Sequence, residues 1–565
     1  MKVIARSFIC SIVVFLSCST FADGASRSTI KAKQGMVVTA HRLASEAGVE
    51  ILKQGGNAVD AAVAVGFALA VVFPEAGNIG GGGFMLVRLH DGKSAVIDFR
   101  EKAPQRATRT MYLDSLGNVT DKSVEGYLAV GVPGTVAGLV KAIEEFGTMK
   151  LANVIQPAIR LAEQGFAVDD RLASSFQDYK DKLLAYPSTV KAFTKNGALF
   201  FEGDTLKQPD LAETLRRIQK DGNDGFYRGQ TARLIVDEMQ HGRGLVTYDD
   251  LKGYEAVVRE PLRGIYRGYE IIAPPPPSSG GLCLFELLNI VEGYDVGSMG
   301  FHSSRSVHVM AEAMKRVYAD RTEFLGDPEF VNVPVDILSS KKYAERRRKE
   351  IDTLHATSSE AVHHGVVASE GDHTTHYNVI DREGNVVATT YTLNDLFGNK
   401  VVVGGAGFFL NDEMDDFSSK PGVPNIYGLI GSEANAIAPQ KRMLSSMCPT
   451  IIVKDGKPIA AFGARGGSRI ITTVFEVIVN LIDFNMNIQD AVDYPRFHHQ
   501  WLPDQLLVEK FCLPADVVQN LQLLGHAVVE NKPATGQLEA LFVDEKTGYF
   551  IGAPDPREGG VAVGY

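Results

Sequence analysis

The chain has 565 residues, of which 45% are hydrophobic and 22% charged, and its formal net charge is -11 at pH 7. A chain of this length and composition is globular, can bury a sizeable core, and would ordinarily divide into two or more domains. The mild acidity and the absence of a long basic run leave no track for nucleic-acid phosphates, so nucleic acid is not an expected partner.

The first 22 residues have the pattern of a secretory signal. Lys2 and Arg6 precede a mostly apolar run over residues 8–18, and small side chains near Ala22 allow a cut. A run of about eleven residues is too short to span a bilayer core of about 30 Å as a helix. We therefore expect residues 1–22 to be removed and the mature protein to be periplasmic or secreted. A buried N-terminal helix and a lipid anchor on Cys18 are the alternatives.

Residues 43–72 predict two helices broken at Gly55-Gly56-Asn57, and the second is apolar on nearly all sides and therefore buried. The segment GNIGGGGF at 77–84 then leads into two strands joined across residues 90–93. This segment lacks the GxxxxGK spacing of a phosphate-binding loop and opens a strand instead of a helix. We expect its glycines to allow close backbone packing.

Two later segments interrupt the alternation of helices and strands. PPPPSSGG at 274–281 predicts a stiff turn before a helix. Residues 352–373 are polar, rich in Ser, Gly and His, and show no period, so we interpret them as a linker.

Cysteines and histidines give no sign of a disulfide framework or a metal site. After the signal only three cysteines remain, widely spaced at Cys283, Cys448 and Cys512. Histidines gather at residues 363–364, 373, 376 and 498–499. Because they lack an HExxH motif or a two-ligand helix spacing, we expect solvated or structural histidines, with no metal and no cofactor.

Residues 374–392 predict a β-hairpin. The sequence from Asp381 to Asn385 fits a three-residue loop with Gly384 in the left-handed conformation. Counting back from this loop pairs Val379 with Val387, Tyr377 with Thr389, Thr375 with Tyr391 and Thr374 with Thr392. Because side chains alternate, the more polar face carries Thr374, His376, Asn378, Thr390 and Thr392. We interpret this face as the candidate site.

Thr374 begins a strand directly after the linker, as an N-terminal nucleophile would. If the chain is cut between His373 and Thr374, the freed α-amine can take the proton from the hydroxyl of Thr374 itself. An α-amine titrates near about 7.7–8.0, so it is partly neutral at physiological pH and suits a general base. Thr392, directly opposite, could orient the hydroxyl. Two cross-strand threonines without any chemistry fit this segment equally well.

Residues 448–482 predict a strand, a turn at Asp455-Gly456, a second strand, and then Gly466-Gly467 at the start of a long apolar helix. Bare glycine amides at a helix N-terminus can stabilise the negative charge that a tetrahedral acyl intermediate develops. They could supply an oxyanion hole, although a plain tight turn would have the same sequence.

Several ordered motifs resemble one enzyme family. TTHYNVIDREGNVVATTYTLN, LNDEMDDFS, PNIYGLIG, KRMLSSM, GARGGSRIITTV and PRFHHQWLPD, in this order, resemble the small subunit of gamma-glutamyltranspeptidase. GGNAVDAAVAVGFALAVVFPEAGNIGGGGFMLVR and DFREKAP resemble its large subunit, and the match runs from about Gly35 to Tyr565.

This resemblance implies an α/β (α+β) fold, the four-layer αββα sandwich of N-terminal-nucleophile hydrolases. It also implies self-cleavage into a large subunit of residues 23–373 and a small subunit of residues 374–565, which form one fold. The implied activity is cleavage of the γ-glutamyl amide of glutathione and related γ-glutamyl compounds. The acyl group would pass to water, an amino acid or a dipeptide.

The resemblance also implies roles for matching positions, residue by residue. Thr374 matches the nucleophile, Thr392 the threonine that supports it, and Gly466 and Gly467 the oxyanion hole. The remaining matches are Arg100, Ser445 and Ser446 for the substrate α-carboxylate, Asp416, Asn394 and Glu413 for its α-ammonium, and Tyr427 in a lid. Taken alone, Arg100 could be a surface ion pair and Asp416 a helix cap.

The chain departs from the family pattern at three places. Glu413 stands where many bacterial members have glutamine, which should keep ammonium recognition intact. Asp395-Leu396 replace a pair of threonines found in some bacterial members, and Arg465 precedes the glycine pair, so acceptor preference stays open. The alternative functions are a cephalosporin or glutaryl acylase on the same fold, which would need no ammonium-binding carboxylate, and an uncleaved, inactive binding homologue.

Overall fold

The structure is a computed structural model that describes residues 27–363, 374–420, 423, 425, 431–530, 536–557 and 559–565. The predicted signal at 1–22, His373 and Tyr427 therefore lie outside the described residues. Among the described residues, no helix is both long and apolar enough to cross a membrane.

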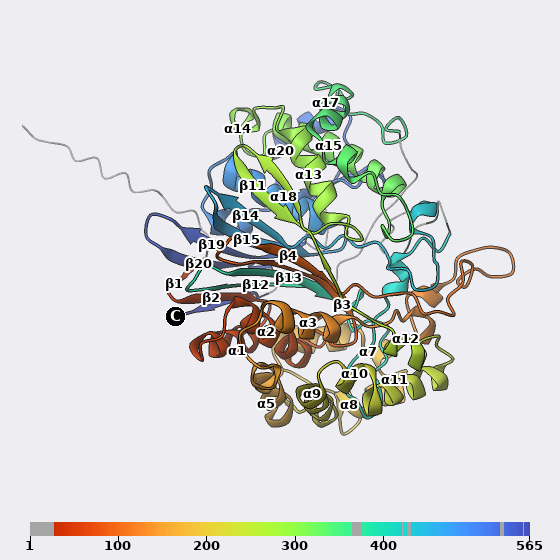
Figure 1. The fold of residues 1–565 in the computed structure, drawn as a ribbon. Helices are drawn as coiled ribbons and strands as arrows, with labels where there is room; N and C mark the ends of the chain where they lie inside the picture. Colours follow the sequence, from red (N-terminus) through yellow and green to blue (C-terminus); the bar gives the residue numbers. More distant parts are fainter. Residues whose placement is uncertain are drawn as a thin grey trace, which may run out of the picture.

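Two seven-stranded antiparallel sheets lie face to face at the centre of the molecule (Figure 1). Sheet I has the order β21 (Val561–Gly564), β2 (Gly35–Thr39), β12 (Thr375–Asp381), β13 (Val386–Thr392), β3 (Gly82–Arg88), β4 (Ser94–Asp98), β9 (Val257–Arg259). Sheet II has the order β1 (Ile30–Ala32), β20 (Tyr549–Pro554), β19 (Gln537–Asp544), β15 (Lys457–Arg465), β14 (Thr450–Lys454), β11 (Tyr269–Ala273), β10 (Leu262–Tyr266). The sheets pack through β12 and β13 against β15.

Helices cover the outer face of each sheet, which gives the predicted four-layer αββα sandwich (Figure 1). On sheet I lie α1 (Arg42–Lys53), α2 (Ala58–Val72) and α3 (Thr135–Phe146). On sheet II lie α13 (Gly280–Val291) and α18 (Arg469–Ile482), with α15 (Ser304–Phe324) packed on α13. Further helices extend these layers, among them α5 (Gln156–Gln164), α6 (Asp170–Asp178), α9 (Pro209–Asp221), α11 (Gly229–Gly242), α17 (Lys341–Lys349) and α20 (Ala515–Leu523).

Local sequence explains the key elements. Every residue of α2 is buried, as its all-round apolar sequence predicts, and Asn57 caps its start by accepting hydrogen bonds from the amides of Val59 and Asp60. The three cysteines Cys283, Cys448 and Cys512 are buried and free.

The β12–β13 hairpin has the predicted register. Val379 pairs with Val387, Tyr377 with Thr389 and Thr375 with Tyr391. In the loop, Asp381 Oδ1 accepts hydrogen bonds from the amides of Glu383 and Asn385 at 3.0 Å, and Gly384 has a φ of 87°. This loop fixes which side chains face the helices and which face sheet II.

The more polar face of the hairpin is not an open site, contrary to the prediction. It packs against sheet II, where Asn378 Nδ2 donates to the carbonyl of Glu539 on β19 at 2.8 Å. His376 Nδ1 lies 2.8 Å from Thr390 Oγ1, and burial lowers the pKa of His376 to about 3, so its ring is neutral. Hydrogen bonds among these polar groups and to sheet II satisfy their donors and acceptors, which allows them to be buried between the two sheets. Only the end of this face next to the linker reaches the sheet edge.

Candidate active site

Four neighbouring strands of sheet I end at one edge and bring the predicted residues together. Thr374 directly precedes β12, and Thr392 ends β13, where it pairs with Gly82 at the start of β3. Arg100 follows β4, and the residue before it still forms both backbone hydrogen bonds to β3, at 3.0 and 3.3 Å. Strand spacing is about 4.8 Å, so about three spacings separate β12 from β4. Thr374 and Arg100 thus lie at the same edge.

The two threonines occupy buried positions there. Thr374 is 5% exposed and Thr392 is 3% exposed. Thr392 Oγ1 accepts a hydrogen bond from the Asn394 amide at 2.9 Å, and Asn394 Nδ2 donates to the Asp412 carbonyl at 3.1 Å. Asn394 has a φ of 82°, which turns the chain sharply after β13. These bonds hold the loop after β13 against the sheet edge.

The Arg100 guanidinium is fully buried and bonded on several sides, so it is not a surface ion pair. Its Nε donates to the Met443 carbonyl at 3.2 Å, and a terminal nitrogen donates to the Leu444 carbonyl at 2.9 Å. It also pairs directly with the carboxylates of Glu413 and Asp416. Burial opposes the charge of Arg100, but these carboxylates raise its pKa above the ordinary value. The contact also shows that Asp416 is more than a helix cap.

Three carboxyl groups face this guanidinium. Besides Glu413 and Asp416, the buried Glu101 has Oε2 3.5 Å from Arg100. Burial raises the pKa of Glu413 to about 7 and also raises the pKa values of Glu101 and Asp416. The carboxyl groups of Glu101 and Glu413 share a hydrogen bond in which the protonated Glu101 is the donor. A ligand with an ammonium group would balance this excess of acidic groups.

Ser445 and Ser446 follow the two carbonyls that bind Arg100, and both are buried. Ser445 Oγ accepts from the Met447 amide at 3.2 Å, and the Ser445 carbonyl accepts from the Ser279 amide at 2.7 Å. Ser446 Oγ accepts from Arg321 at 2.8 Å, and Arg321 also donates to Ser279 Oγ at 2.9 Å. The segment is therefore fixed between the PPPPSSGG turn and helix α15.

Two residues of this site were not predicted. Glu101 directly follows Arg100 in DFRE, and that adjacency was a usable signal. Arg321 lies on α15, more than 90 residues before Asp416, and no local pattern distinguishes it from other helix arginines.

The glycine pair lies where β15 turns into α18. Gly466 has a φ of 126° and Gly467 a φ of 53°, both in the left-handed region that glycine tolerates. Arg465, just before them, lines a cleft together with His41, which follows β2, and Leu396, which follows β13. Because β2 and β13 flank β12, the glycine turn belongs to the same edge as Thr374.

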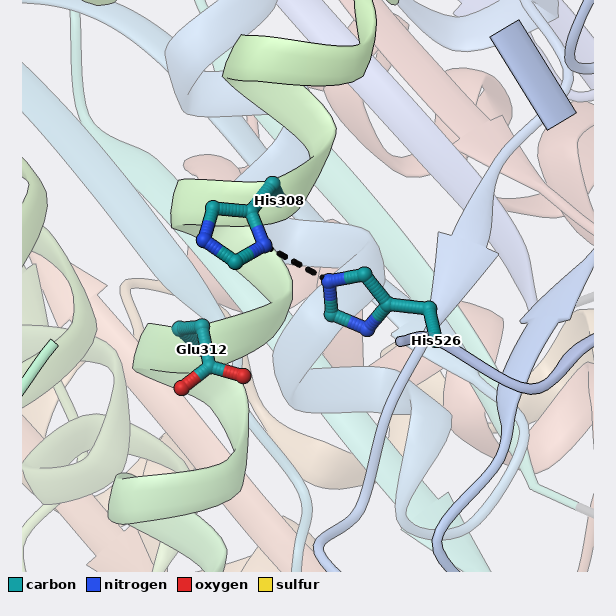
Figure 2. A group of neighbouring side chains, drawn as sticks. All are labelled: His308, Glu312 and His526. Carbon is teal, nitrogen blue, oxygen red and sulfur yellow. Dashed lines mark hydrogen bonds between the residues drawn. The ribbon is translucent and has the colours of Figure 1, made fainter. Parts of the chain in front are cut away.

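Away from this edge, His308, Glu312 and His526 form a group of potential metal ligands, with donor atoms within 4.8 Å of one another (Figure 2). His308 Nδ1 and His526 Nε2 lie 2.7 Å apart, within hydrogen-bond distance. The Glu312 carboxylate already pairs with Lys315 at 2.9 Å and with Arg316 at 2.7 Å. Two cations beside Glu312 would repel a metal ion, so the group is better explained as a structural network. None of its histidines was considered from the sequence.

Comparisons with known proteins place the chain among related proteins. The family model described as Gamma-glutamyltranspeptidase matches residues 44–565. Glutathione hydrolase proenzyme of Escherichia coli (strain K12) is 51% identical over 531 residues, which cover 94% of this chain and 91% of that protein.

The chain is also similar to solved structures. Cephalosporin acylase from Bacillus halodurans has a TM-score of 0.84 at 30% identity, covering 98% of this chain and 99% of that chain. Helicobacter pylori gamma-glutamyltranspeptidase has a TM-score of 0.57 at 48% identity, covering 57% of this chain and 93% of that chain. The family match includes Arg100, Thr374, Thr392 and the Gly466-Gly467 pair.

Proposed function

Because the chain belongs to the gamma-glutamyltranspeptidase family, we propose that it is a γ-glutamyl transferase and hydrolase that cleaves the γ-glutamyl amide of glutathione and related compounds. One observation carries the proposal. The buried Arg100 and an excess of carboxyl groups lie at the same edge as Thr374. A guanidinium and carboxylates are the groups that bind the two charges of an α-amino acid.

Maturation would begin with a cut between His373 and Thr374. Strands from before and after this cut alternate within both sheets, so the two pieces should stay together as a pair of subunits. In sheet I, β12 and β13 come from residues after 373 but lie between β2 and β3, which come from residues before it. Sheet II likewise has β14 paired with β11. Separating the two pieces would break these ladders and expose the core.

Catalysis would use Thr374 as the nucleophile and its own α-amine as the base. The hydroxyl oxygen attacks the γ-carbonyl carbon while its proton passes to the amine. The amides of Gly466 and Gly467 would stabilise the resulting oxyanion. The C–N bond of the substrate then breaks, the leaving amine takes the proton, and a γ-glutamyl ester of Thr374 remains. Water or an acceptor amine attacks this ester and restores the hydroxyl.

Donor binding would use the Arg100 cluster. Arg100, Ser445 and Ser446 would bind the α-carboxylate, and Asp416, Glu413 and Asn394 the α-ammonium. Since the Arg100 guanidinium pairs directly with Asp416 and Glu413, the head group of the donor must replace part of these contacts. An expected lid residue, Tyr427, lies outside the described residues. From residues 1–22, we place the mature enzyme in the periplasm or outside the cell.

A second function is favoured by one observation. The whole-chain similarity to a cephalosporin acylase fits hydrolysis of glutaryl-type amides on the same fold. The two functions differ at the α-ammonium, which a glutaryl group lacks.

Parallel assays with γ-glutamyl and glutaryl p-nitroanilides test the proposal. We expect the purified, cleaved protein to prefer the γ-glutamyl anilide by roughly tenfold or more in kcat/KM, since a charge-assisted hydrogen bond contributes about 1.5–3 kcal/mol. Equal kcat/KM for both anilides, or a preference for the glutaryl one, would overturn it in favour of the acylase.

A further inference from the structure

A second buried arginine reaches the site from a different layer than Arg100. Arg321 lies near the end of α15, which packs on α13 over sheet II. Its Nε donates a hydrogen bond to Ser279 Oγ at 2.9 Å, and a terminal nitrogen donates to Ser446 Oγ at 2.8 Å. Arg321 therefore holds the side chain of one of the two serines proposed to bind the α-carboxylate of the substrate.

Arg321 also lies beside Asp416. Both residues line a small cavity together with Leu444, whose carbonyl accepts a hydrogen bond from Arg100. Burial raises the pKa of Asp416, and the charges of Arg100 and Arg321 oppose this rise. Two guanidinium groups thus border the substrate-binding cluster, one that follows a strand of sheet I and one from the helices over sheet II.

The backbone around Ser446 is held by bonds that do not involve the guanidinium of Arg321. The Ser445 amide donates to the Pro277 carbonyl at 3.0 Å, and the Ser445 carbonyl accepts from the Ser279 amide at 2.7 Å. These backbone bonds place the serine pair. What Arg321 adds is a restraint on the hydroxyl group of Ser446.

A guanidinium carries hydrogen-bond donors only, so it restricts how a hydroxyl in contact with it can be oriented. Because Ser446 Oγ accepts from Arg321, the hydrogen of this hydroxyl must point away from the guanidinium. A serine hydroxyl without such a partner rotates and can either donate or accept. Accepting from a cation also polarises the O–H bond, which makes the hydroxyl a stronger hydrogen-bond donor.

We propose that Arg321 is a positioning residue that directs the hydroxyl hydrogen of Ser446 toward the α-carboxylate of the substrate and thereby selects substrates in which this carboxylate is free. The inference rests on the proposed γ-glutamyl transfer and hydrolysis, and it adds a residue that controls substrate choice through Ser446. Arg100 and Ser446 then both present N–H or O–H groups to the α-substituent. A carboxylate accepts at both oxygens, whereas an α-carboxamide places its NH2 group against one of them.

Two substrates test the proposal: γ-glutamyl p-nitroanilide and its analogue with an α-carboxamide in place of the α-carboxylate. The measured quantity is the ratio of their kcat/KM values, in which a general loss of activity cancels. Arg321→Met keeps the length of the side chain but removes its hydrogen-bond donors. We expect the wild type to prefer the carboxylate, and this variant to lower the preference roughly tenfold. Arg305→Met replaces an exposed arginine at the start of the same helix and should leave the ratio unchanged.

A double-mutant cycle shows whether Arg321 acts through Ser446. Ser446→Ala alone should also lower the preference for the carboxylate, and adding Arg321→Met to it should change the ratio by less than about twofold. A merely structural role would lower kcat/KM for both substrates alike. A direct contact of Arg321 with the carboxylate would lower the ratio again in the Ser446→Ala background. Either result would overturn the inference.

If Arg321→Met does not mature, Ser279→Ala replaces it, because this variant removes the second hydroxyl that holds the guanidinium. The preference should then fall about threefold, and an unchanged ratio would contradict the assignment. An unchanged ratio in Arg321→Met, or a changed one in Arg305→Met, would contradict it as well. Failure of the wild type to release p-nitroaniline would instead defeat the proposed function, whereas release together with any of these outcomes defeats only the inference about Arg321.

Discussion

The guanidinium of Arg100 contacts the carboxylate of Asp416 directly. From the sequence, these residues were expected to form opposite halves of a clamp, one for each end of an amino acid. Their contact means that Asp416 keeps a partner when a ligand brings no ammonium group. The cost of binding a glutaryl group is therefore smaller than for an isolated buried carboxylate, which costs about 3–5 kcal/mol when its partner is lost.

Asp416→Asn should weaken the γ-glutamyl reaction more than the glutaryl one. Removing the charge that meets the α-ammonium costs about 1.5–3 kcal/mol, which is roughly tenfold to hundredfold in kcat/KM. The glutaryl reaction loses no such contact. The measurement is the ratio of kcat/KM for the two anilides in one preparation of each protein. An equal fall in kcat/KM for both anilides would show that Asp416 does not bind the α-ammonium of the donor.

Arg100→Lys should strongly lower kcat/KM, although it keeps the positive charge. A lysine cannot reach the carbonyls of Met443 and Leu444 and both carboxylates together, so buried acceptors would lose their donors. We expect transition-state stabilisation to fall by about 3 kcal/mol or more, which lowers kcat/KM by roughly a hundredfold.

The matched control is Arg109→Lys, because Arg109 forms an exposed pair with Glu433. Kinetics and calorimetry of both variants are compared with the wild type. If the kcat/KM of Arg100→Lys stays within a few-fold of the wild-type value, the guanidinium of Arg100 is not required to bind the donor.

Glu413 should make stability depend on pH. Burial raises its pKa to about 7, so between about pH 4.5 and 7 the folded chain binds a proton that the unfolded chain has released. This contribution to stability is complete below about pH 4.5 and is lost as the pH rises through 7. Arg100, Glu101 and Asp416 surround the group, and Arg100 keeps its charge throughout this range.

The free energy of unfolding of the wild type, minus that of Glu413→Gln, should therefore fall by about 1.4 kcal/mol per pH unit across that range. Denaturant titrations of both proteins at several pH values measure this difference. A difference that is flat or rises with pH would contradict the assignment.

Removal of metal ions by a chelator should change neither the stability nor the activity of the protein. Because Lys315 and Arg316 already neutralise Glu312, the His308–His526 group needs no ion to be stable. Dialysis against EDTA should leave Tm and turnover unchanged, and metal analysis of the purified protein should find no stoichiometric zinc. A fall in Tm that zinc restores would instead establish a metal centre there.

The sequence predicted the elements that carry strong local signals. The hairpin register followed from Gly384 and the alternation around it, and the buried helix α2 from its uniform apolar composition. The polar face of the hairpin was misjudged because alternation says which residues share a face, but not that a second sheet covers it. His376 and Asn378 are polar because they bond to each other and to β19.

Site residues were harder to predict where contacts span the chain. Arg100 and Asp416 are separated by 316 positions, and only the fold brings them into contact. Arg321 carries no local signal at all. The cleft with Leu396 and Arg465 could not be foreseen, because its walls come from many segments that are far apart in the chain, among them the ends of β2, β13 and β15 and the helix α6.

Thr375 offers a matched control for the nucleophile. Its Oγ1 is buried and has no hydrogen-bond partner among the described residues, so Thr375→Val keeps the shape and removes an unsatisfied group. This variant should mature and turn over donor like the wild type. Thr374→Ala should remain one chain and be inactive. Loss of maturation in Thr375→Val would point to the wrong threonine.

The mass and first residues of the fragments decide whether Thr374 is an N-terminal nucleophile. After expression, we expect a fragment that ends at His373 and one of 192 residues that begins Thr-Thr-His, since 565 − 373 = 192. Intact-mass analysis and N-terminal sequencing of the same active preparation give both values. An active protein that stays one chain, a small fragment that begins at another residue, or a cleaved and active Thr374→Ala would contradict it.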